Sequence, residues 1–99
     1  MRRFVDYLNS VVLLSADTEQ HIAEAHPEVT LDQIRQSLGN PDEVRRSSYK
    51  TTTTLYYQIR YVNRYTCVVV KKCVDGFYIA TAMTTTKPKG GEVLYVKDK

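Results

Sequence analysis

The chain has 99 residues, of which 42% are hydrophobic and 25% charged, as is usual for a folded globular domain and unusual for a disordered segment. No apolar run approaches the roughly 20 residues that cross a bilayer, and no signal-peptide pattern follows Arg2 and Arg3. We therefore expect one cytoplasmic domain over residues 1–99, with a single core and no membrane contact.

The net charge of +3 hides an asymmetry between the two parts of the chain. Residues 1–43 contain three basic and eight acidic side chains, whereas residues 44–99 contain eleven basic and three acidic ones. Such a division indicates that the second part faces a polyanion. The alternative is a bipolar surface on which Lys and Arg are simply solvated.

Neither cysteine predicts a disulfide or a cofactor. Cys67 and Cys73 fall in one predicted strand, so six residues separate them by about 20 Å, whereas a disulfide needs Cα atoms within about 7 Å. No Cys or His spacing is typical of a metal site. We expect two packing thiols in a reducing compartment, no metal and no cofactor.

The first 40 residues predict one or two short strands and then two short helices. Residues 4–14 are apolar, with a possible turn at Asn9-Ser10. Asp17 is a candidate N-cap with Gln20 in capping-box position, and the first helix should end before Pro27. Thr30 is expected to cap a second helix with Gln33 at N3, in capping-box position, and Gly39 fits the C′ position just after the helix. The helical half is thus expected over about residues 15–40.

The rest of the chain, about residues 43–96, predicts an antiparallel sheet. Its β-branched and aromatic segments are Glu43–Ser47, Leu55–Tyr61, Arg64–Val74, Phe77–Thr84 and Glu92–Val96. Asp75-Gly76 is a strong hairpin signal, and Val62-Asn63 is a weaker one. The expected fold is α+β, with two short N-terminal helices packed on one face of a four- to five-stranded antiparallel sheet.

The two turns also predict which side chains share a face, because strand residues alternate from one face to the other. The face covered by the helices is expected to carry Leu55, Tyr57, Ile59, Val68, Val70, Phe77, Ile79 and Met83. The open face is expected to carry Tyr56, Gln58, Arg60, Tyr65, Cys67, Val69, Lys71, Cys73, Tyr78, Ala80, Ala82 and Thr84.

The expected open face combines tyrosines and cations with small residues. This pattern is typical of a trough in which bases stack and phosphates pair with cations, although an ordinary solvated sheet face is the alternative. The candidate RNA-binding residues on it are Tyr56, Gln58, Arg60, Tyr65 and Tyr78.

The sequence has no phosphate-binding glycine loop, nucleophile elbow, acidic pair or zinc signature. The remaining reactive side chains are those used in metal-free RNA cleavage, which needs a base, an acid and cations. His21 and His26 are the two histidines, the residue type that ordinarily titrates near neutrality. They are about 140° apart on a regular helix, so each could instead be a helix-surface or interface histidine.

Several short runs resemble one family when they are taken together in order. They are His21 to Glu28, Asn40 to Arg46, Leu55-Tyr56-Tyr57, Arg64 to Lys71, Ile79 to Thr84 and Lys87 to Val93. They resemble the phage-type members of the barnase–EndoU–colicin–RelE (BECR) superfamily of small toxin-like ribonucleases, over roughly residues 17–96. Met83 departs from the pattern, which usually has an aromatic residue there.

The resemblance implies two N-terminal helices against a four- or five-stranded sheet, RNA cleavage on the face away from the helices, and a cognate antitoxin partner. Carried over residue by residue, it nominates as catalytic His21, His26, Arg45, Lys71 and Thr84. It also implies RNA contacts by Arg64 and Lys87. Catalytic sets vary within the superfamily, so the resemblance does not assign the acid and the base.

The leading interpretation is a metal-independent endoribonuclease, a toxin or a phage-derived nuclease, that cleaves RNA by attack of the 2′-hydroxyl. The first alternative is a non-catalytic RNA-binding or protein-interaction module on the same scaffold. The second is a small structural subunit whose open face pairs with a partner chain.

Overall fold

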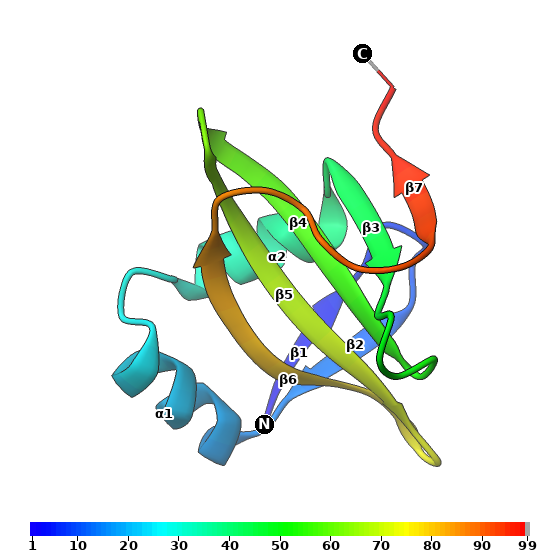
Figure 1. Ribbon diagram of the computed structural model, residues 1–99. Helices are drawn as coiled ribbons and strands as arrows, with labels where there is room; N and C mark the ends of the chain where they lie inside the picture. Colours follow the sequence, from blue (N-terminus) through cyan, green and yellow to red (C-terminus); the bar gives the residue numbers. More distant parts are fainter. Residues whose placement is uncertain (99) are drawn as a thin grey trace.

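The computed structural model describes residues 1–98, which form two helices and seven strands (Figure 1). The elements in chain order are β1 (Arg2–Val5), β2 (Val11–Leu14), α1 (Ala16–Ala25), α2 (Leu31–Gly39), β3 (Glu43–Arg46), β4 (Thr53–Tyr61), β5 (Arg64–Cys73), β6 (Gly76–Thr85) and β7 (Val93–Val96).

All seven strands belong to one mixed sheet with the order β1-β2-β6-β5-β4-β3-β7. Neighbouring strands are antiparallel except β2 and β6, which run parallel with Val12 beside Phe77 and Leu13 beside Tyr78. The α+β class is correct, but the predicted antiparallel sheet of four to five strands is wrong. Residues 4–14 have the composition of strands, yet nothing local in the sequence reveals that they join β6, because that pairing spans both helices.

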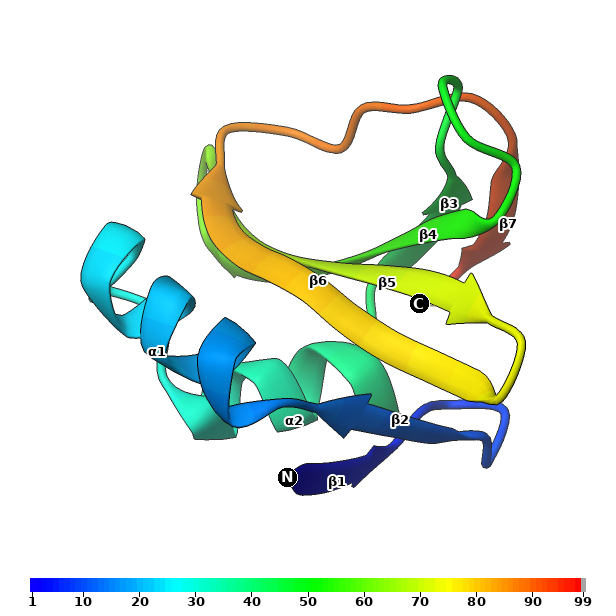
Figure 2. The ribbon, with the colours of Figure 1, turned by 90° about the horizontal axis from the view of Figure 1, so that it is seen from below.

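Both helices lie on the same side of the sheet, which we call the inner face (Figure 2). α1 packs beside β6, and α2 packs against β1, β4 and β5. The core between the helices and the sheet consists of Phe4, Val12, Leu14, Ile22, Val29, Ile34, Leu38, Val44, Tyr56, Val68, Val70, Ile79 and Ala82. The opposite side, the outer face, is the side seen in Figure 1.

The helix ends follow local capping chemistry. Ser15, not Asp17, caps α1, and its hydroxyl accepts a hydrogen bond from the Thr18 N–H at 3.2 Å. The capping box predicted for α2 is confirmed, with Thr30 and Gln33 bonded reciprocally at 3.1 and 3.2 Å. Neither helix in residues 1–98 is long and apolar enough to cross a membrane.

The β5–β6 turn lies one residue earlier than predicted. Cys73 pairs with Gly76, so the turn residues are Val74 and Asp75. Gly76 is therefore the first residue of β6, and its φ of +148° is a conformation that suits glycine. The partner of Val70 is Ile79 instead of the predicted Thr81. This shift is by two residues, so near the turn the side chains of both strands stay on their predicted faces.

Two β-bulges overturn the predicted faces farther along the strands. Arg60 is the extra residue in β4, and Ala80 is the extra residue in β6. Each bulge shifts the alternation by one residue, so part of each strand changes face. Predicted core residues that lie on the outer face are Leu55, Tyr57, Ile59 and Met83. Predicted open-face residues that lie on the inner face are Tyr56, Gln58, Ala82 and Thr84.

The remaining face predictions near the β5–β6 turn are correct. Inner-face residues predicted correctly are Val68, Val70, Phe77 and Ile79. Outer-face residues predicted correctly are Tyr65, Cys67, Val69, Lys71 and Tyr78. Cys67 and Cys73 are both free, as their separation along β5 predicts.

The tip of the β1–β2 hairpin reaches across the curled sheet. The buried carboxylate of Asp6 accepts the Tyr56 hydroxyl at 2.8 Å and two backbone N–H groups within its own turn, those of Leu8 and Ser10, at 3.0 and 2.8 Å. The next residue, Tyr7, packs its ring 4.6 Å from that of Tyr95 in β7. These contacts connect the first strands of the sheet to its far edge.

Candidate functional site

The predicted catalytic residues are distributed over separate parts of the molecule. Arg45 lies on the outer face, where it pairs with Glu43 and its Nη1 is 3.5 Å from the carbonyl oxygen of Gly90. His21 is exposed on α1, and Lys71 is exposed on β5. Only His26 and Thr84 lie near the same hollow, described below. The predicted set therefore does not form one site.

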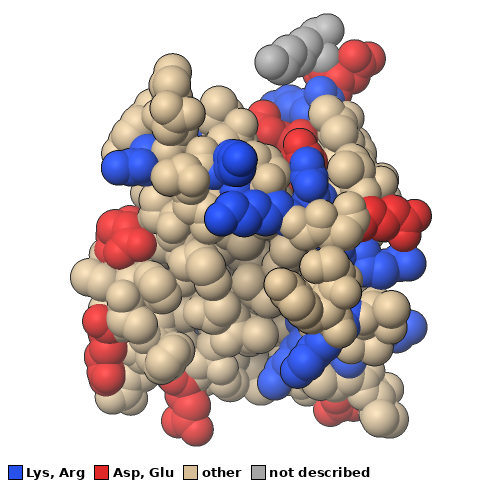
Figure 3. All heavy atoms as spheres, viewed as in Figure 1, with Lys and Arg blue, Asp and Glu red and all other residues tan. Residues whose placement is uncertain are grey.

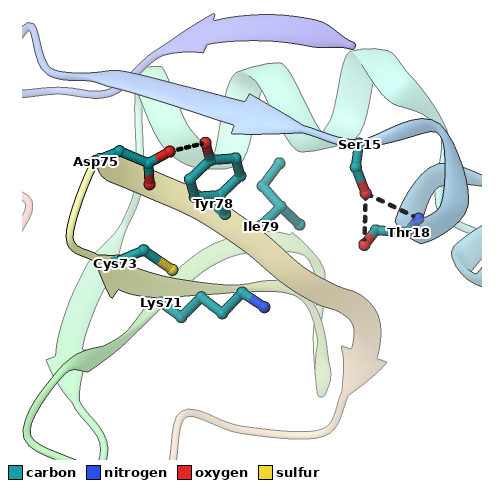
Figure 4. Close-up of a pocket in the computed structure, with 7 residues that line it drawn as sticks. All are labelled: Ser15, Thr18, Lys71, Cys73, Asp75, Tyr78 and Ile79. Atoms are coloured by element: carbon teal, nitrogen blue, oxygen red, sulfur yellow. Dashed lines mark hydrogen bonds between the residues drawn. The ribbon is translucent and has the colours of Figure 1, made fainter.

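Lys71 lies beside a first hollow of about 300 Å³, which we call the Lys71 hollow (Figure 4). Its lining residues are Ser15, Thr18, Lys71, Cys73, Asp75, Tyr78 and Ile79. The Tyr78 hydroxyl donates to Asp75 at 3.0 Å, and this bond raises the pKa of Tyr78. The hollow offers one cation, one carboxylate and hydroxyl groups but no imidazole. Its carboxylate already accepts the Tyr78 hydroxyl.

A second hollow of about 290 Å³ lies on the inner side, between the tip of the β4–β5 hairpin and the segment that joins the helices; we call it the Glu28 hollow. Its lining residues are Glu28, Gln33, Arg60, Tyr61, Arg64, Thr66 and Thr84. Thr66 and Thr84 are cross-strand partners, and Tyr61 pairs with Arg64. The hollow thus combines a carboxylate, two guanidinium groups and hydroxyl groups.

Glu28 is the acidic centre of this hollow. Its own backbone N–H, the Thr84 hydroxyl and the nearby His26 lower the pKa of Glu28 against a smaller opposing effect of desolvation. The Nδ1 atom of His26 is 3.7 Å from Glu28 Oε2. The Glu28 carboxylate is therefore ionised at neutral pH and close to an imidazole, in a hollow that Arg60 and Arg64 also line.

The backbone of the segment between the helices fixes these two side chains. The His26 N–H donates to the carbonyl oxygen of Ile22 at 2.7 Å and ends α1 where Pro27 disfavours further helix. The His26 carbonyl oxygen accepts the Val29 N–H at 3.0 Å. About one third of the His26 side chain is exposed, so its ring is accessible to a ligand.

Glu28 was missed by sequence reasoning. It follows His26-Pro27 directly, but one carboxylate on an acidic helical segment is not distinctive. The informative signal would have been its proximity to Thr84, which depends on the β6 bulge. Without that bulge, Thr84 would point away from the helices.

Two predicted RNA-binding residues serve the fold instead. Tyr56 is buried and bonded to Asp6. The Gln58 amide donates to the carbonyl oxygens of Gln36 and Asn40 at 3.3 and 3.1 Å, at the end of α2. Both were predicted on the open face, and the β4 bulge explains why they lie inside.

The other predicted RNA contacts are accessible. Tyr65 is half-buried on the outer face, while Arg60, Arg64 and Lys87 are exposed. Figure 3 shows Lys and Arg side chains over the upper part and the lower right of the outer face, with acidic side chains mainly toward its margins. The basic side chains therefore form separate groups on the outer face, with uncharged surface between them (Figure 3).

A strap of residues 86–91 crosses the outer face in front of β4 and β5 (Figure 1). The Tyr57 hydroxyl holds the strap by donating to the Lys89 carbonyl oxygen at 2.8 Å and accepting the Lys89 N–H at 3.1 Å. Burial raises the pKa of Tyr57 to about 12 and that of Cys67 to about 12. The Cys67 thiol therefore stays protonated at neutral pH and is a packing group.

Within residues 1–98, no three His, Cys, Asp or Glu side chains lie close enough together to hold a metal ion. No protein-family model, curated protein or solved structure matches this chain.

Proposed function

We propose that this protein is a metal-independent endoribonuclease whose active site is the Glu28 hollow. The observation that supports the proposal is that the Glu28 carboxylate, 3.7 Å from the imidazole of His26, lines the same hollow as the guanidinium groups of Arg60 and Arg64. Phosphodiester cleavage through the 2′-hydroxyl requires these chemical groups. The BECR resemblance implies the same chemistry and a toxin role with a cognate antitoxin, but it implies cleavage on the face away from the helices, whereas the Glu28 hollow lies on the helix side.

The reaction would proceed by an internal displacement at phosphorus. Glu28 takes the proton of the 2′-hydroxyl as the 2′-oxygen forms its bond to phosphorus. Arg60 and Arg64 stabilise the negative charge that accumulates on the phosphorane oxygens. His26 gives a proton to the 5′-oxygen as the bond from phosphorus to that oxygen breaks. Since Nδ1 of His26 faces Glu28, Nε2 is the nitrogen available for that step. The products are a 2′,3′-cyclic phosphate and a 5′-hydroxyl.

The Lys71 hollow supports this function less well. Its carboxylate, Asp75, accepts the Tyr78 hydroxyl, and its single cation leaves the charge of a phosphorane only partly compensated. Arg45 on the outer face is likewise occupied by its pairing with Glu43. By contrast, no ion pair within residues 1–98 involves Arg60 or Arg64.

The first prediction concerns metal dependence and products. Purified protein should cleave single-stranded RNA in excess chelator and leave 2′,3′-cyclic phosphate and 5′-hydroxyl ends, because every group in the mechanism belongs to the chain. End-specific labelling of the products, with and without chelator, measures both. Cleavage that stops in chelator, or that leaves 5′-phosphate ends, contradicts the mechanism. Binding without any cleavage would make the protein an RNA-binding module.

The second prediction concerns salt. RNA affinity should fall as salt rises, with a log–log slope of about −0.7 for each phosphate contact to a single strand. Arg60→Ala and Arg64→Ala should each reduce the slope by about 0.7. Arg35→Ala is the matched control, since Arg35 pairs with Asp32 at 3.2 Å on α2 and lies outside the hollow. Equal slopes for all the variants would exclude the hollow as the phosphate site.

A further inference from the structure

The β4 bulge determines where the ring of Tyr61 lies. Tyr57 and Ile59 are on the outer face, and regular alternation would place Tyr61 there as well. Because Arg60 is an extra residue, Tyr61 instead pairs with Arg64 and lines the Glu28 hollow. Bulges that redirect one side chain are frequent beside functional sites.

The Tyr61 ring is exposed, although it lines a hollow. Its exposed fraction is 69%, and it takes part in none of the three aromatic pairs among residues 1–98. Six other tyrosines of the chain are half-buried or buried, and Tyr49 is the only other one that is as exposed. The Tyr61 ring is thus free to stack on a flat ligand beside two guanidinium groups.

The chemistry around Tyr61 matches one nucleotide unit. Arg60 and Arg64 carry the charge that a phosphate group needs, and an aromatic ring next to them suits the base. A base inside a duplex is stacked on its neighbours and cannot place its face on a protein ring. An unpaired base can do so.

We propose that Tyr61 is a stacking platform for an unpaired base adjacent to the scissile phosphate, so that the Glu28 hollow accepts single-stranded RNA and not duplex RNA. The inference rests on the proposed function, which places the phosphate in this hollow. Tyr61 is thereby a specificity residue that binds the substrate and takes no part in proton transfer.

The test measures binding without cleavage. A short 2′-O-methyl RNA has no free 2′-hydroxyl to attack phosphorus, so fluorescence anisotropy can compare its affinity as a single strand and as a blunt duplex. Wild-type protein should bind the single strand more tightly. Tyr61→Leu should weaken single-strand binding roughly 5- to 150-fold, the range that base–aromatic stacking gives, and leave duplex binding unchanged.

Two further variants separate stacking from other effects. Tyr61→Phe retains the ring and should bind the single strand as wild type does. Tyr49→Leu is the matched control, because Tyr49 is 95% exposed and lies before β4, whereas Tyr61 is at the end of that strand. Circular dichroism should show the same fold for all variants, because both side chains are exposed.

The outcomes distinguish this inference from the proposed function. Equal wild-type affinity for single strand and duplex, no RNA binding, or equal effects of Tyr61→Leu and Tyr49→Leu would each overturn the stacking role. Cleavage of unmodified RNA with normal binding by Tyr61→Leu would remove the stacking role and leave the nuclease. Tyr61-dependent binding of single strands without any cleavage would support the stacking role and reject the nuclease.

Discussion

Glu28→Gln should cleave RNA about 10²- to 10⁴-fold more slowly than the wild-type protein, the usual loss for a general base. Glutamine keeps the shape of the side chain and cannot accept the proton of the 2′-hydroxyl. Because Glu28 is at the surface of the hollow, the substitution should leave the free energy of unfolding nearly unchanged. Single-turnover cleavage measures the chemical step, and anisotropy checks that RNA still binds.

Glu24→Gln provides the matched control for that experiment. Glu24 is an exposed carboxylate on α1 that accepts the Gln20 amide at 2.9 Å and does not line the hollow. Replacing the Glu24 carboxylate by an amide should leave the cleavage rate unchanged. A similar decrease in both variants would mean that general negative charge on and just after α1, and not a base at position 28, affects the rate.

The pH dependence of cleavage tests the same assignment. The pKa of Glu28 is lowered from 4.5, so the carboxylate remains the base form as pH falls to that value and is protonated only below it. The acid limb of the rate should therefore lie below pH 4.5. An acid limb above that pH, in protein that circular dichroism shows to be folded, would assign the titration to another group.

Periodicity and capping signals predicted where most helices and strands of this chain lie, but not the number of strands in its sheet. The capping box of Thr30 and Gln33, the helix end before Pro27 and the strand-rich second half all depend on local residues. The parallel pairing of β2 with β6 could not be predicted, because it brings together segments more than 60 residues apart in the chain. Non-local pairing depends on which surfaces pack, and a single sequence does not reveal this.

The candidate site was predicted only in part, for a related reason. Arg60 and Thr84 were named as candidates on an open face that two bulges divide, whereas Arg64 was named only from the family resemblance. A bulge changes the face of every residue beyond it, and neither Arg60 nor Ala80 carries a distinctive bulge signal such as glycine. His26 was named as a candidate because histidine ordinarily titrates near neutrality. Its partner Glu28 was not named, because the role of Glu28 in the site depends on where Thr84 lies.

The hydrogen bonds of Asp6 should make one of the largest contributions to stability among polar groups of the chain. Asp6→Ala should lower the free energy of unfolding by roughly 3 kcal/mol, because it removes a charged acceptor from three donors and leaves the buried Tyr56 hydroxyl unsatisfied. Tyr56→Phe should cost ~1–3 kcal/mol, since Asp6 keeps its two backbone donors. Urea unfolding measures both.

The effect of Tyr56→Phe must be separated from that of changing any tyrosine in this cluster. Tyr95→Phe is the control, because its ring packs on Tyr7 while its hydroxyl has no hydrogen bond within residues 1–98. The double variant of Asp6 and Tyr56 should cost less than the sum of the two single variants, because each substitution removes the same bond. Additive costs, or equal costs for Tyr56→Phe and Tyr95→Phe, would mean that aromatic packing alone connects the β1–β2 hairpin to β7. In that case the hydrogen bonds of Asp6, in the turn of the β1–β2 hairpin, would contribute little to the curl of the sheet.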